Sequence, residues 1–304
     1  MAKRYGVGDY QYESVDDWPA DDIPGMASDA ACDSEGRVYV AVRISQAFDN
    51  NHGAIVVYDR EGRRLDSWGE EYLKVPHSIW ISPSNEIFFT DTWDHVVRKY
   101  STSGELLMTL GMPGMPGMPG GPFNMPTSVV QANNGELYVS DGYRQSRIHR
   151  FTADGELTLS WGSGDLNDYE RAIHSSTAKP GTGPGEFNLP HSVNVGADGR
   201  VYVMDRSNLR IQVFDSEGNY LDQWNDVPSP NQATIDRDNM MHVATAAGVQ
   251  VWTVDGELLG IWGEKGDRPD QFSGAPHGIW IDSNGDVYVA QVGAQKALNK
   301  FARL

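Results

Sequence analysis

A pattern of about sixteen residues recurs along this chain and constrains its fold more than any other feature. The clearest copies begin with Pro-His: Pro76–Asp91, Pro190–Asp205 and Pro276–Gln291. More distant copies are Met26–Val42, Pro126–Asp141 and Pro230–Thr245. Six copies at intervals of about 40–64 residues lie in or near the range that is typical of β-propeller blades.

Each copy has the same order of strand and turn signals. A short alternating run, such as His191–Val195, is followed by a turn rich in Ser, Asn, Asp and Gly, and then by a β-rich run, such as Val201–Met204. A third run ends in an aromatic residue (Ile211–Phe214), and a fourth ends near a tryptophan (Leu221–Asn225). Residues of these types and runs of this length are typical of strands. Four antiparallel strands in each of six repeats predict an all-β, six-bladed β-propeller.

The two ends of the chain indicate how this propeller closes. The last copy ends at Leu298–Leu304, after its third strand, so its blade lacks the outer strand. Near the start, Tyr10–Trp18 has a strand-like pattern that belongs to none of the copies. We expect this N-terminal strand to complete the last blade and close the ring, which removes two exposed sheet edges. Residues 1–304 are therefore predicted to form a single domain.

Two insertions lengthen the spacing between copies. Gly111–Gly121 is built from Gly, Met and Pro and is predicted to be a loop, either a connector or a methionine-lined entrance to a substrate site. Residues 163–184 contain Tyr169–His174, a segment long enough for one or two helical turns. This second insertion is expected to be either a lid or a surface loop.

Charge and cysteine content exclude several classes of protein. The chain has 24 basic and 42 acidic residues, a formal net charge of −18. Such a surface disfavours binding to nucleic acid and to anionic lipid. Cys32 is the single cysteine, so internal disulfides are excluded and a reducing compartment is expected. Because we find neither a signal peptide nor an apolar run of membrane-spanning length, we expect a cytoplasmic protein.

The second residue of the repeated pattern alternates between histidine and other residues. In chain order it is Ala27, His77, Thr127, His191, Asn231 and His277. The first strand of each blade lines the channel, so alternate blades would bring three imidazoles toward one point. Three neutral nitrogens with one open position are the ligand set of a catalytic zinc, and they also accept Fe, Co, Cu or Mn. The alternative is that Pro-His merely begins a blade, with the ring capping a turn, but strict alternation favours the metal.

Residues that follow the second strand of a blade are expected on the same face as these histidines. They include Arg43 in the first blade, Tyr143 in the third and Arg206 in the fourth. Arginine is suited to bidentate capture of a carboxylate, and a tyrosine beside a metal is a plausible general base or acid. Asp141 and Asp205 are instead expected to pair with Arg147 and Arg210 and to hold the blades together. The histidines outside the alternating set are expected in solvent or in packing positions: His52, His95, His149, His174 and His242.

Three segments resemble a known enzyme family. They are Ser140–Ile148, Gly185–Ser192 and Asp205–Gln212. They are similar to peptidyl-α-hydroxyglycine α-amidating lyase, the lyase half of the peptide-amidating enzymes, which is an NHL-repeat propeller. The similarity covers essentially all six blades.

The resemblance implies both a ligand set and a reaction. It implies a catalytic zinc held by His77, His191 and His277. It also implies a base at Tyr143 and carboxylate-binding arginines at Arg206 and Arg43. The family breaks the N–Cα bond of a peptidyl-α-hydroxyglycine and releases an amide and glyoxylate. A small carboxylate-bearing molecule is therefore the expected substrate.

This chain departs from the family pattern at three positions. Ala275 stands before Pro276 where the family has methionine, so one wall of the pocket differs. Gly278 replaces an acidic residue that helps to hold a structural calcium in the family, which leaves calcium binding open. Arg144 stands where the family has a disulfide cysteine.

Three functions are compatible with these observations. The first is a zinc-dependent lyase that acts on a small α-hydroxylated amide. The second is a propeller hydrolase such as a lactonase, although such enzymes usually hold calcium with carboxylates and asparagine rather than with histidines. The third is a non-catalytic NHL binding platform, which would purify without stoichiometric zinc.

Overall fold

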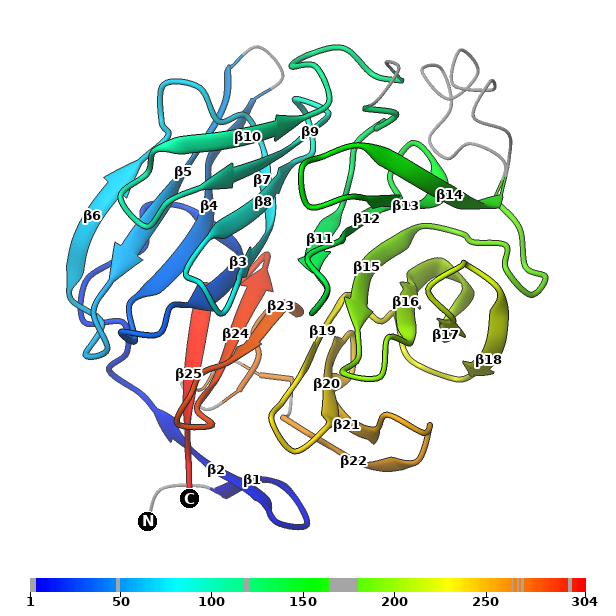
Figure 1. The fold of residues 1–304 in the computed structure, drawn as a ribbon. Coiled ribbons are helices and arrows are strands. Elements are labelled where there is room, and N and C mark those ends of the chain that lie inside the picture. The colour runs from blue at the N-terminus through cyan, green and yellow to red at the C-terminus, as the bar shows by residue number, and fades with distance from the viewer. Residues whose placement is uncertain are drawn as a thin grey trace. The chain divides into compact units, whose positions relative to one another are not determined.

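The computed structural model describes residues 4–47, 50–117, 121–163, 180–263, 265–266, 268, 271–294 and 297–304. Their regular structure is almost entirely β-strand, in six sheets that follow one another along the chain (Figure 1). The fold is a six-bladed β-propeller, as predicted. Within these residues no helix has the length and apolar character needed to cross a lipid bilayer.

The chain divides into two compact units, residues 1–85 with 231–304, and residues 86–230. The first unit contains the strands β1 (Arg4–Val7), β2 (Tyr10–Val15), β3 (Met26–Cys32), β4 (Val38–Ala47), β5 (Asn50–Tyr58), β6 (Arg64–Trp68), β7 (Pro76–Ile81), β19 (Gln232–Ile235), β20 (Met240–Thr245), β21 (Gly248–Thr253), β22 (Leu258–Trp262), β23 (Ala275–Ile281), β24 (Val287–Val292) and β25 (Leu298–Arg303). Its sheets include β3-β4-β5-β6, β19-β20-β21-β22 and β1-β2-β25-β24-β23.

The second unit is built in the same way. Its elements are β8 (Ile87–Asp91), β9 (Val96–Tyr100), β10 (Leu106–Leu110), β11 (Ser128–Gln131), β12 (Leu137–Asp141), β13 (Ser146–Phe151), β14 (Leu157–Ser163), β15 (Pro190–Val195), β16 (Val201–Asp205), the 3-10 helix η2 (Arg206–Asn208), β17 (Arg210–Phe214) and β18 (Tyr220–Trp224). Its sheets include β11-β12-β13-β14 and β15-β16-β17-β18.

The turns between strands form because aspartate and glycine occupy fixed positions in them. In the turn after β17, the Asp215 carboxylate accepts hydrogen bonds from the backbone N–H groups of Glu217 and Asn219, both at 2.9 Å. Gly218 in that turn has a φ of 76°, which glycine adopts without strain. These turns reverse the chain and set the antiparallel register of the adjacent strands.

The second strands of the blades are buried over nearly their whole length. All five residues of β8, of β12 and of β16 are buried. A tyrosine near the start of the second strand recurs as a fully buried side chain, at Tyr39, Tyr138, Tyr202 and Tyr288. The near-continuous apolar runs of the sequence therefore mark strands that are covered on both faces.

The predicted N-terminal strand is present and completes the last blade. β2 lies beside β25 (Figure 1) and pairs with it antiparallel. The register places Tyr12 opposite Arg303. Tyr12 is 1% exposed and stacks on Trp262, with ring centroids 5.3 Å apart. A further strand, β1, pairs with β2 and makes this sheet five-stranded. The sequence analysis did not anticipate β1.

The two insertions are only partly described. Residues 118–120 of the Gly-Met-Pro insertion lie outside the described residues, and Met112 and Met115 in the described part are exposed. Residues 164–179, including the segment with helical potential, also lie outside the described residues. The alternatives for both insertions therefore stay predictions.

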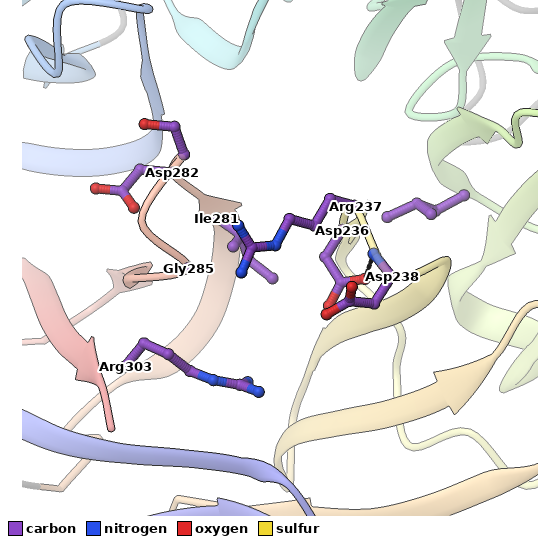
Figure 2. A pocket seen from close by; sticks show the side chains of 9 residues that line it. Asp236, Arg237, Asp238, Ile281, Asp282, Gly285 and Arg303 are labelled. Carbon is purple, nitrogen blue, oxygen red and sulfur yellow. Dashed lines mark hydrogen bonds between the residues drawn. The ribbon is translucent and has the colours of Figure 1, made fainter.

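A cavity of about 220 Å³ opens beside the end of β23. The turns that follow β19 and β23 line it, together with the end of β25. Figure 2 shows three carboxylates and two guanidinium groups around this space, from Asp236, Asp238, Asp282, Arg237 and Arg303.

Candidate metal centre

A β-bulge marks the position of the histidine in two blades. In the ladder of β15 and β16 the register shifts between Pro190 and Ser192, so His191 is the extra residue. In β23 and β24 it shifts between Pro276 and Gly278, so His277 is the extra residue. A bulge turns a side chain out of the regular alternation of a strand. The bulges therefore change the direction in which both imidazoles leave their strands.

The same bulge corrects the alignment of the first blade. In β3 and β4 the register shifts between Ala27 and Asp29, so Ser28 takes the place of the histidine. The prediction that Ala27 holds this position was wrong by one residue. The error arose because the sequence of β3 carries one residue more before its bulge than the other copies do.

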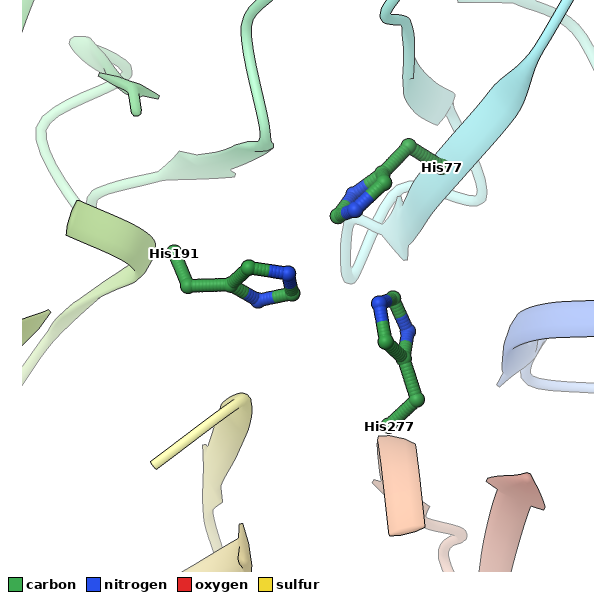
Figure 3. Close-up of side chains that lie close together, drawn as sticks. All are labelled: His77, His191 and His277. Carbon is green, nitrogen blue, oxygen red and sulfur yellow. The ribbon is translucent and has the colours of Figure 1, made fainter. Parts of the chain in front are cut away.

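The three histidines of the alternating set are buried and close together. His77, His191 and His277 are 2%, 1% and 6% exposed, and each offers a ring nitrogen within 4.8 Å of the others (Figure 3). The rings of His77 and His277 meet edge to face, with centroids 4.8 Å apart. Zinc binds histidine nitrogens at about 2.0–2.1 Å, so ligation of one ion would draw the nitrogens about an ångström closer together.

The hydrogen bond of His277 tests whether the group suits a metal. Its Nδ1 lies 2.7 Å from the backbone carbonyl oxygen of Ser28. A carbonyl oxygen only accepts, so Nδ1 carries the proton and Nε2 keeps its lone pair. Metal-ligating histidines are usually fixed by a hydrogen bond of this kind. The donor set and this tautomer fit a divalent transition metal.

Tyr143 lies beside one member of this group. It follows β12, and its hydroxyl is 3.2 Å from Nε2 of His191. The two rings meet at 87°, with centroids 5.7 Å apart. Gly142 precedes it, and a Cβ there would come within 2.3 Å of the Pro190 carbonyl oxygen. Glycine at 142 therefore allows the Tyr143 loop to approach the strand that carries His191.

The two predicted arginines lie in different settings. Arg43 was expected in a loop, but β4 continues to Ala47, so Arg43 is a strand residue opposite Gly53. Its Nε donates to the backbone carbonyl oxygen of Pro76, the residue before His77, at 3.1 Å. Arg206 begins η2, and its backbone N–H donates to the Leu189 carbonyl oxygen at 3.2 Å. Both side chains are half-buried. Binding of a substrate carboxylate by either arginine stays a prediction.

The aspartates that end the second strands have structural roles. Asp205 pairs with Arg210 at 2.8 Å, as expected, and accepts a hydrogen bond from the Asn188 backbone N–H. Asp141 accepts one from the Asn124 backbone N–H at 2.8 Å. Each carboxylate therefore links the loop before a blade to the end of the second strand of that blade.

Two histidines outside the alternating set are packing residues, as expected. His149 and His242 are fully buried, and Nε2 of each faces an aspartate, at 3.5 Å from Asp141 and 3.0 Å from Asp236. Burial lowers the pKa of His149.

The sequence analysis missed Asp29, which directly follows the bulge in β3. This side chain is fully buried and accepts hydrogen bonds from the Ile79 backbone N–H at 2.9 Å and from Gln232 at 2.8 Å. A Cβ at Gly278 would lie 2.3 Å from its Oδ1. The absence of a side chain at 278 therefore makes room for the carboxylate of Asp29. When Ser28 is aligned with the histidines, Asp29 takes the position that Gly278 has in the last blade. With that alignment, Asp29 would have been recognised as an acidic residue of the site.

Burial dominates the electrostatics of Asp29. Removal from water raises the pKa of this carboxyl to about 7, although hydrogen bonds from Ile79, Gln232 and Ala30 oppose the shift. Desolvation disfavours the charged form of an acid, which explains the direction.

A second cavity, of about 340 Å³, opens at the start of β23. We call it the Ala275 hollow; its lining is mainly small residues: Ala246, Ala247, Gly248, Lys265, Phe272, Ser273, Gly274, Ala275 and Pro276. Pro276 is bonded directly to His277. The cavity in Figure 2 lies at the other end of the same strand, which is about 20 Å long. Of these two cavities, only the Ala275 hollow is lined by the residue that precedes His277.

Comparison with known proteins gives a consistent picture. The NHL repeat family model matches residues 187–214. NHL repeat-containing protein 3 of Homo sapiens is 31% identical over 94% of this chain and 83% of its own length. Peptidyl-alpha-hydroxyglycine alpha-amidating lyase 1 of Drosophila melanogaster is 26% identical over 93% of this chain and 53% of its own length. The solved structure of a gluconolactonase from Xanthomonas campestris shares the fold, with a TM-score of 0.67 at 12% identity over 100% of this chain and 95% of that one. The chain belongs to the NHL-repeat β-propeller family that includes NHL repeat-containing protein 3.

Proposed function

We propose that this chain is a metal-dependent lyase that cleaves the N–Cα bond of an α-hydroxyglycine amide and releases an amide and glyoxylate. The observation that carries the proposal is the buried group of three histidines, with the Tyr143 hydroxyl within hydrogen-bond reach of one of them. Similarity to an α-hydroxyglycine amidating lyase over 93% of the chain supports the same reaction class.

Each participant has a defined part in this reaction. Zinc, or another divalent ion on the three histidines, would lower the pKa of the substrate hydroxyl. Tyr143 would accept the hydroxyl proton, and the electrons left on that oxygen would form the carbonyl of glyoxylate. The electrons of the broken N–Cα bond stay with the amide nitrogen. Tyr143 then returns the proton to that nitrogen, so that atoms and charge balance.

The arginines would hold the other end of the substrate. A guanidinium group offers paired N–H donors that match a carboxylate. Arg43 and Arg206 are the residues that we assign to the carboxylate that becomes part of glyoxylate. The partner of this protein is then a small carboxylate-bearing molecule.

The direct test is to incubate the zinc-loaded protein with an N-acyl-α-hydroxyglycine and to measure both products. We expect the amide and glyoxylate to appear in equal amounts and a chelator to stop their release. Hydrolysis of a lactone without any glyoxylate would assign the chain to the hydrolases instead. A protein that purifies without stoichiometric metal and turns over neither substrate would be a binding platform.

Replacement of Tyr143 by phenylalanine is expected to lower kcat by about 100-fold, because a positioned acid or base contributes about 10²–10⁴. KM should change little, since the aromatic ring stays in place. Bound metal, measured by elemental analysis, should also stay the same. Tyr202→Phe is the matched control, because that buried tyrosine lies near the start of β16, away from the Tyr143 loop. Equal kcat values for the two variants would remove Tyr143 from the mechanism.

The Ala275 hollow suggests where the acyl part of the substrate lies. Its lining of small side chains beside Pro276 suits an apolar group of several carbons. Ala275→Met should fill this space and raise KM for an N-phenylacetyl substrate by about 10-fold or more, while an N-acetyl substrate is little affected. Ala153→Met is the control, because Ala153 is an exposed turn residue of the second unit. The same KM change for both substrates would show that the acyl group lies elsewhere.

A further inference from the structure

The three blades without a histidine each make the same kind of hydrogen bond. At the position of the histidine they carry a polar residue, and its side chain donates to the backbone carbonyl oxygen of the proline that begins the next blade. These contacts are Ser28 Oγ to Pro76 at 2.8 Å, Thr127 Oγ1 to Pro190 at 2.9 Å, and Asn231 Nδ2 to Pro276 at 2.7 Å. All three donors are buried.

Each acceptor is the residue immediately before a histidine of the cluster. The carbonyl of Pro190 belongs to the peptide plane that also contains the backbone nitrogen of His191. Fixing that carbonyl therefore fixes the orientation of the plane from which the His191 side chain departs. In β15 this matters because His191 is the extra residue of a bulge, where the regular ladder is interrupted.

We infer that Ser28, Thr127 and Asn231 are positioning residues that orient the backbone of His77, His191 and His277 for metal binding. The inference rests on the metal site proposed above. It also explains the alternation in the sequence, because blades that supply a ligand alternate with blades that supply the donor which orients the next ligand. If these side chains served only to hold neighbouring blades together, their removal would not change the affinity for the metal.

Thr92 provides a matched control for Thr127. Its Oγ1 donates to the Pro126 carbonyl oxygen at 2.9 Å, and the residue after Pro126 is Thr127 rather than a histidine. Thr92 and Thr127 are both buried, at 2% and 0% exposed. Thr92→Val and Thr127→Val thus each remove a buried hydroxyl that donates to a proline carbonyl, but only the second proline precedes a ligand.

The experiment measures zinc affinity by competition with a chromophoric chelator, together with the visible spectrum of the cobalt-substituted protein. We expect Thr127→Val to weaken zinc binding by about 10-fold or more, the size of effect found when a group that orients a ligand is removed. The cobalt spectrum should change as well. Thr92→Val acts on the ligand only indirectly, through Thr127, so it should change both readouts much less, and Thr127→Ser, which keeps the hydroxyl, should restore the wild-type affinity.

The outcomes separate this inference from the proposed function. If the wild-type protein binds no stoichiometric zinc or cobalt, the metal site itself is wrong. If the wild type binds metal but Thr127→Val and Thr92→Val have the same affinity, the positioning role is wrong and the proposed function stands. Urea unfolding of both variants provides the check on folding, and Thr127→Val is expected to lose more stability because its hydroxyl also lies 2.8 Å from the Ser140 hydroxyl.

Discussion

Replacement of His191 by alanine is expected to abolish stoichiometric zinc binding and, with it, glyoxylate release. His191 is 1% exposed and supplies one of three ring nitrogens that lie within 4.8 Å of one another. Removal of a group that only orients a ligand costs about 10–100-fold in metal affinity, so loss of the ligand itself should cost at least about 100-fold. Elemental analysis of the purified protein gives this readout without any assay of activity.

The control for His191→Ala is another buried histidine. His149 is 0% exposed, and its ring nitrogens face Ser160 and Asp141. His149→Ala should lower the free energy of unfolding, because it leaves a cavity and an aspartate without its neighbour, but it should keep the metal. Full metal content in His191→Ala would show that the three histidines are packing residues.

The second large effect is a loss of stability at neutral pH that depends on Asp29. Burial raises the pKa of this carboxyl to about 7, whereas the ordinary value is 3.8. The folded protein therefore holds a proton on Asp29 between about pH 4 and pH 7 that the unfolded chain has lost. The protonated carboxyl makes its full contribution to the free energy of unfolding below about pH 4. This contribution is lost as the pH rises toward 7, and the loss is up to about 4 kcal/mol.

Urea unfolding of the metal-free protein tests this expectation. The difference in free energy of unfolding between the wild type and Asp29→Asn should fall from pH 4.5 to pH 7.5, because asparagine does not titrate. Asp215→Asn is the control: hydrogen bonds from Asn219 and Glu217 lower the pKa of Asp215, so its contribution is already complete above pH 4.5. A constant difference for Asp29→Asn across the range would contradict the assignment.

Periodicity was sufficient to predict the blades. The repeated pattern and the apolar runs located β16, the second strand of its blade, to within a residue. They also located β2, because the last blade lacked a strand and one strand-like segment near the N-terminus belonged to no blade. No comparable pattern predicts β1, which adds a fifth strand to an already complete blade.

Predictions about the site were more limited, for a physical reason. The histidines were identifiable because a side chain type repeats at a fixed place. The bulge at Ser28 was not, because one extra residue in a strand changes which side chains face the channel without altering composition. Asp29 was missed for the same reason, and Arg43 was placed in a loop because the extension of β4 is set by its pairing with β5.

Hydrogen bonds from Ser28, Thr127 and Asn231 had no signature in the sequence at all. Small polar residues are common at the ends of strands, and which carbonyl they reach depends on the packing of one blade on the next. Only the structure shows that all three donate to the same kind of acceptor, the carbonyl oxygen of a proline that precedes a histidine.

The pairing of β2 with β25 also dictates when the molecule can finish folding. β25 is synthesised after β2 and after the strands of all six blades between them, so the hydrogen bonds of this pair form only once those strands have been made. Until then β2 presents unpaired backbone groups that other chains can bind. Completion of the last blade thus has to wait for β25, and a chain interrupted before Leu298 leaves β2 with an open edge.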